Sequence, residues 1–88
     1  MTTPTMTPFQ TEMWRILCDA ETQAAEAAQL TGADALELFA DAANHIYAVE
    51  RSLRGAFGDT ITDADEATVT DWLTITRKTV LHFLADLA

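Results

Sequence analysis

Two histidines each lie one helical turn from an aspartate, which is the pattern with the most obvious chemistry in the sequence. Asp41 precedes His45 by four residues, and Asp86 follows His82 by four. If both segments are helical, each pair shares a helix face and can form an ion pair. Two such pairs turned toward one another would offer a divalent metal nitrogen and oxygen ligands. Both histidines fall beside the apolar stripes, however, so we expect solvated side chains and keep metal binding as an alternative.

The other side chains that could act in catalysis lack the neighbours that catalysis needs. Cys18 is the only cysteine, and Asp19 and Glu21 beside it would raise the pKa of its thiol rather than lower it. Ser52 is the only serine, and no glycine elbow surrounds it. Three glycines do not suffice for a phosphate-binding or dinucleotide-binding loop. We therefore predict a protein that is not an enzyme and has no cofactor and no resident metal.

Glu50 interrupts an apolar stripe between Ile46 and Leu53, and a carboxylate in that position needs a partner or access to solvent. Arg54 lies one turn later on the same side, and Tyr47 lies about one turn earlier. An ion pair between Glu50 and Arg54 at the edge of the fold is the simplest solution. The alternative role of this pair is a polar contact that fixes the register of a partner helix.

Few helix-breaking residues interrupt the chain, and they divide it into the segments that position these side chains. The chain has 88 residues, which is enough for one domain with a modest core. Prolines and glycines occur only at positions 4, 8, 32, 55 and 58. They predict a flexible Thr/Pro tail at 1–7 and a single helical domain at 8–88, with helices at about 8–30, 33–56 and 63–87.

Capping residues support these helix starts. Thr7 can act as an N-cap, Pro8 suits the first helical position, and Gln10 can close a capping box. Thr62 offers a second cap, and three acids follow it, where the helix dipole favours negative charge. Residues 68–80 contain eight β-branched residues in thirteen, which would suit a strand, but their apolar residues recur with a helical period.

Each expected helix has an apolar stripe that predicts a core. The stripes comprise Phe9, Met13, Ile16, Ala20, Ala24, Ala27 and Leu30; Phe39, Ala42, Ala43, Ile46, Val49, Leu53, Ala56 and Phe57; and Val69, Trp72, Leu73, Thr76, Val80, Phe83, Leu84 and Leu87. Ile75 and Leu81 lie off the third stripe, as ordinary exposed aliphatics. Short connections make neighbouring helices antiparallel. The expected fold is all-α, a small antiparallel three-helix bundle (up-down-up) that homodimerisation could complete.

The first helix carries a second apolar face. Its members are Trp14, Cys18, Ala25 and Ala28, bridged to the core stripe by Leu17 and interrupted only by the polar Glu21. Two apolar faces need two partners. Either this helix lies in a groove between the other two, or the second face meets another chain with Trp14 as its anchor. We favour the second interpretation and take these six residues as the candidate protein-binding site.

Composition limits the choice of partner and location. Fourteen acids against five basic residues give a net charge of −9, which makes nucleic acid or an anionic membrane a poor direct partner. The first residues lack the positive charge and apolar run of a signal peptide, and one cysteine excludes an internal disulfide. We expect a cytoplasmic protein.

These observations favour a non-enzymatic, acidic helical interaction module, such as an adaptor, inhibitor or regulatory subunit. Its partner would be a second copy of the chain, another protein, or both. One alternative is a nucleic-acid mimic that occupies the basic channel of a DNA- or RNA-handling protein. The other alternative is the metal-binding protein built on the two His/Asp pairs.

Overall fold

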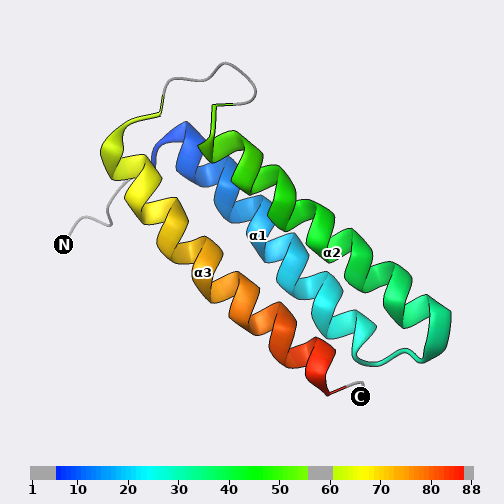
Figure 1. Cartoon of the computed structure of the whole chain (residues 1–88). Coiled ribbons are helices and arrows are strands. Elements are labelled where there is room, and N and C mark those ends of the chain that lie inside the picture. The colour runs from blue at the N-terminus through cyan, green and yellow to red at the C-terminus, as the bar shows by residue number, and fades with distance from the viewer. Residues whose placement is uncertain (1–5, 56–60, 87–88) are drawn as a thin grey trace.

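A computed structural model describes residues 6–55 and 61–86 of the chain. Within these ranges three helices pack against one another, and there is no strand: α1 spans Pro8–Ala27, α2 spans Gly32–Leu53 and α3 spans Asp63–Ala85. Figure 1 shows α1 lying between α2 and α3. The contacts of α1 with each neighbour are far more extensive than those between α2 and α3. The predicted all-helical, three-helix fold is confirmed.

Both predicted N-caps are present. The Thr7 hydroxyl accepts a hydrogen bond from the backbone N of Gln10 over 3.1 Å, and Pro8 occupies the first turn. Thr62 caps α3 in the same way, accepting from the backbone N of Asp65 over 3.1 Å. The predicted capping box through Gln10 is not formed among the described residues, and Gln10 Nε2 donates to Asp65 Oδ1 over 2.8 Å. Thr7, which the predicted boundary assigns to the tail, therefore belongs to the start of α1.

The helix ends differ from the expected ones by a few residues. α1 stops at Ala27, and the backbone N of Leu30 donates to the carbonyl of Ala27 in a turn that precedes Gly32. Gly32 has a φ of +63°, a conformation that glycine adopts without steric cost. Gly55, with a φ of +72°, follows the C-cap of α2 and donates to the carbonyl of Ser52. The predicted ends at residues 56 and 87 lie outside the described residues.

The β-branched stretch at 68–80 is helical. The hydroxyls of Thr74 and Thr79 each donate to a backbone carbonyl one turn earlier, over 3.0 Å, which satisfies them within the helix. Val69 and Val80 are buried against the rest of the molecule. Tertiary packing of this face therefore outweighs the strand propensity of its residues.

The core follows one row on each helix. It comprises Met13, Leu17, Ala20, Ala24 and Ala27 on α1; Ala35, Phe39, Ala42, Ile46 and Val49 on α2; and Val69, Leu73, Thr76 and Val80 on α3. Two leucines of the predicted stripes are exposed instead: Leu30, which follows the end of α1, and Leu84, at 39%. Ala43 of the second stripe is also exposed. Ala56, Phe57 and Leu87 lie outside the described residues.

None of the described helices combines the length and the apolar character that crossing a membrane would require.

Candidate functional site

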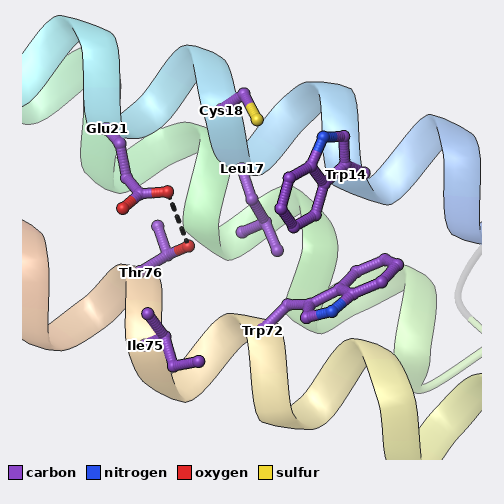
Figure 2. A pocket seen from close by; sticks show the side chains of 7 residues that line it. All are labelled: Trp14, Leu17, Cys18, Glu21, Trp72, Ile75 and Thr76. Carbon is purple, nitrogen blue, oxygen red and sulfur yellow. Dashed lines mark hydrogen bonds between the residues drawn. The ribbon is translucent and has the colours of Figure 1, made fainter.

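A groove between α1 and α3, here called the tryptophan groove, contains most of the candidate residues. It has a volume of about 230 Å³ and is lined by Trp14, Leu17, Cys18, Glu21, Trp72, Ile75 and Thr76 (Figure 2). The two indoles meet edge to face, with ring centroids 5.0 Å apart and planes at 70°. This geometry is favourable for aromatic rings. Trp14 is still 46% exposed, and Ile75 is 60% exposed.

The second apolar face of α1 is turned toward α3. Thr76 Oγ1 donates a hydrogen bond to Glu21 Oε2 over 3.4 Å, and Trp14 packs on Trp72. Leu17 is 1% exposed and therefore belongs to the core of the single chain rather than to a free surface. The packing of α1 between two helices thus accounts for much of this face. What it leaves open to solvent is the outer side of the groove, around Trp14 and Ile75.

The small residues of the second apolar face of α1 do not all lie in the tryptophan groove. Ala25 and Ala28 are partly buried and are not among the residues that line the groove. Cys18 is partly buried beside Trp14. Burial raises the pKa of its thiol, and the charges of Glu21 and Asp19 raise it further. The thiol is therefore protonated at neutral pH, which does not favour a nucleophilic role.

A second groove separates α2 from α3, on the side where these helices make few contacts with each other. Here called the α2–α3 groove, it has a volume of about 430 Å³ and is lined by Phe39, Ala43, Ile46, Tyr47, Glu50, Arg77, Val80, Leu81 and Leu84. Tyr47 is 54% exposed and Leu81 is 61% exposed. Sequence reasoning did not identify this groove. The available signal was the spacing of Arg77, Leu81 and Leu84, which places them on one face of α3.

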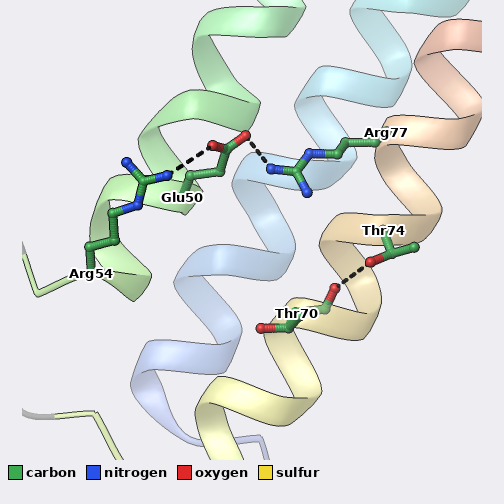
Figure 3. Close-up of polar contacts among 5 residues, drawn as sticks. All are labelled: Glu50, Arg54, Thr70, Thr74 and Arg77. Carbon is green, nitrogen blue, oxygen red and sulfur yellow. Dashed lines mark hydrogen bonds and ion pairs between the residues drawn. The ribbon is translucent and has the colours of Figure 1, made fainter.

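Glu50 lies at one end of the α2–α3 groove and has two basic neighbours (Figure 3). Arg54 Nη2 is 3.9 Å from Glu50 Oε2, so the predicted neighbour on the same helix is present but distant. Arg77 of α3 is closer, with its Nη2 2.5 Å from Glu50 Oε1. The principal partner of this carboxylate therefore comes from another helix, and the ion pair links α2 to α3 at the groove.

The two His/Asp pairs do not come together. His45 Nδ1 lies 2.9 Å from the backbone carbonyl oxygen of Asp41, within hydrogen-bonding distance. His82 Nε2 lies 3.8 Å from Asp86 Oδ2, and both side chains are exposed. Among the residues that the structure describes, no group of three or more His, Cys, Asp or Glu side chains could hold a metal ion.

Comparison of the chain with models of protein families, with curated proteins and with solved structures found no match. The functional argument therefore starts from the two grooves and from the charges around them.

Proposed function

We propose that this chain is a non-enzymatic protein-interaction module that binds another protein chain through the tryptophan groove. One observation carries this proposal: Trp14 is half exposed yet held in place by Trp72. A large, preordered aromatic side chain loses little conformational freedom on binding, and tryptophan is enriched among the residues that dominate interface energies. Such a module would serve as an adaptor, an inhibitor or a regulatory subunit.

The partner that we propose for this groove is a second copy of the chain. We propose an antiparallel, up-down-up bundle for each copy. A twofold axis between two copies would place the same patch of each copy against the other. Glu21 is the only charged residue among the described residues that line the groove, and Thr76 already donates a hydrogen bond to its carboxylate. The surface that would be buried is thus mainly apolar, which suits self-association. Cytoplasmic location, where Cys18 would stay reduced, belongs to the same proposal.

Charge predicts how this dimer should respond to salt. Each copy has a net charge of −9, so two copies repel one another at low ionic strength. Salt screens this repulsion over a Debye length of about 8 Å at physiological ionic strength. We expect the dimer to become tighter as salt rises.

The test is the solution molar mass, measured by light scattering after size exclusion over a range of concentrations and salt. The wild type is expected to dimerise. Ile75→Glu changes an exposed residue of the groove and should give a monomer with unchanged helicity and melting temperature. Leu81→Glu, an equally exposed leucine of the α2–α3 groove, is the matched control and should remain a dimer. A wild type that is monomeric under all conditions, or a dimeric Ile75→Glu variant, would overturn the assignment of the second copy.

Trp14→Glu separates the interface from the core. Because nearly half of this side chain is exposed, the variant should lose association while it keeps most of its helicity. A variant that unfolds completely would show that Trp14 acts as a core residue, and the groove would then lose its proposed anchor.

The nucleic-acid mimic has less support, because several acids are already engaged within the bundle. Asp65 is buried and accepts hydrogen bonds from α1, Glu12 pairs with Arg15 over 2.6 Å, and Glu50 pairs with Arg77. A protein that mimics nucleic acid needs acidic side chains on one face of the molecule, spaced like the phosphates of a nucleic acid. Binding to a basic nucleic-acid enzyme that falls steeply with salt would restore this alternative.

A further inference from the structure

The α2–α3 groove is as long as about three turns of a helix. Its lining runs from Phe39 to Glu50 on α2, a rise of about 17 Å or three helical turns. Phe39, Ile46 and Val80 form its floor, since these three are buried and also belong to the core. Tyr47 and Leu81 form its walls and are more than half exposed. A fourth helix laid here would cover the exposed apolar surface of Tyr47 and Leu81.

Most of the basic residues of this acidic chain lie on, or next to the end of, the two helices that form this groove. Four of the five Lys and Arg residues lie at the C-terminal end of α2, where Arg54 is the C-cap, and in the middle of α3: Arg51, Arg54, Arg77 and Lys78. Arg77 lines the groove, and the guanidinium of Arg51 lies 5.7 Å from the ring centroid of Tyr47. Lys78 precedes Leu81 by three residues, which makes the two side chains neighbours on the surface of α3.

Among the residues that the structure describes, Glu50 is the only acid that lines the groove, and it contacts both Arg54 and Arg77. The single negative charge of Glu50 faces the two positive charges of Arg54 and Arg77, which leaves a local surplus of one positive charge. This surplus sits within a molecule whose net charge is −9. At physiological ionic strength charges interact mainly within about 8 Å, so this local charge, rather than the net charge, acts on a bound ligand.

We infer that the α2–α3 groove binds an amphipathic helix of a partner protein whose apolar face is flanked by acidic side chains. Its apolar residues pack on Tyr47, Leu81 and Leu84. Its acids lie near Arg54, Arg77 and Lys78, where charge complementarity fixes orientation and discriminates against basic helices. A second copy fits this groove poorly, because two equal surpluses of positive charge would face one another. The inference concerns a surface separate from the tryptophan groove and does not depend on it.

Two synthetic peptides of about 16 residues, long enough for three turns with capped ends, serve as probes. They have the same leucine face, and the flanking positions are glutamate in one and lysine in the other. Titration calorimetry against the full chain at physiological salt measures both dissociation constants. We expect the glutamate peptide to bind about tenfold more tightly, as two or three exposed ion pairs would give. Equal binding, or tighter binding of the lysine peptide, would overturn the inference.

Two matched pairs of variants locate the binding. Leu81→Glu should abolish binding of the glutamate peptide, whereas Ile75→Glu, on the other groove, should retain it. Lys78→Glu should weaken binding of the glutamate peptide several-fold and reduce its preference over the lysine peptide. Arg15→Glu makes the same change of charge on α1, away from the groove, and should leave the preference unchanged. Equal effects of Lys78→Glu and Arg15→Glu would show a response to net charge alone and would contradict a local site.

Two other occupants are distinguishable. If Leu81→Glu, but not Ile75→Glu, lowers the molar mass of the wild-type assembly, the groove holds a second copy and the inference is wrong. If the chain sediments with anionic lipid vesicles and Leu81→Glu prevents this, the occupant is a membrane surface, which also overturns it.

Discussion

Gln10 Nε2 donates a hydrogen bond to Asp65 Oδ1 over 2.8 Å, which joins the first turn of α1 to the first turn of α3. The same carboxylate oxygen accepts a second hydrogen bond from Thr7 Oγ1 over 3.0 Å. Thr7 caps α1, and the backbone N of Asp65 is capped by Thr62. Asp65 is only 7% exposed, so one buried carboxylate connects the caps of two helices that lie far apart in the sequence.

Replacement of Asp65 should weaken this end of the bundle. Asp65→Ala removes the acceptor of both hydrogen bonds. Because hydrogen bonds to a charged group are stronger than average, we expect the unfolding free energy to fall by about 2–4 kcal/mol. Asp65→Asn keeps a side-chain oxygen at the same place and should lose about half as much. Urea unfolding followed by circular dichroism measures both. An Asp65→Ala variant as stable as the wild type would contradict a structural role for this carboxylate.

Leu17, on α1, and Leu30, in the turn after the end of α1, provide a direct comparison of a buried and an exposed leucine. Leu17 is 1% exposed and Leu30 is 40% exposed. Leu17→Ala should lower the unfolding free energy by about 2–5 kcal/mol through lost burial and the resulting cavity. Leu30→Ala should change it by less than about 1 kcal/mol. The same urea experiment compares the two variants, and similar losses would argue against the placement of Leu17 in the core.

Gln23 offers a stabilising substitution. Its Oε1 atom is buried and has no hydrogen-bond partner, which is an energetic penalty that an apolar side chain of similar length would remove. Gln23→Met should therefore raise the unfolding free energy by about 1 kcal/mol. Gln29→Met, at an exposed position, is the control and should have little effect. Thermal unfolding is a sufficient readout, and a lower melting temperature for Gln23→Met would refute the prediction.

The titration of Cys18 should report its surroundings. Burial and the neighbouring acids raise the pKa of its thiol, so the folded chain has less thiolate at any given pH than the unfolded chain. The midpoint of the pH–rate profile for alkylation should lie higher in the folded protein than in urea. Glu21→Gln removes one of the acidic neighbours and should lower the folded midpoint. A folded midpoint at or below the unfolded one would show that the thiol is not shielded.

Local patterns in the sequence were sufficient for the helices and most of the core. Thr7 and Thr62 mark helix starts because capping depends on residues three positions apart. The end of α1 was harder to predict, since Ala27 and Ala28 carry no stop signal and the turn is made before Gly32. Leu30 consequently falls outside the helix on which the periodicity placed it.

Features that depend on how the helices lie in space were not predictable from periodicity. The ion pair of Glu50 with Arg77 joins two helices, and the sequence indicated only Arg54, one turn away. The α2–α3 groove exists because these two helices contact α1 much more than each other, and no single helix encodes that arrangement. The same holds for the edge-to-face contact of Trp14 with Trp72.

Alanine plays a structural role along the central helix. Ala20, Ala24 and Ala27 of α1 are fully buried, as is Ala42 of α2. Protein interiors are close-packed, so a larger side chain at these positions would push the packed helices apart. In a saturation mutagenesis screen scored for folding, these positions should accept only glycine, serine or cysteine at modest cost, whereas Ile75 and Leu81 should accept most polar residues. Mutational tolerance in this chain would then follow the volume available at each site more closely than the chemical character of the residue that occupies it.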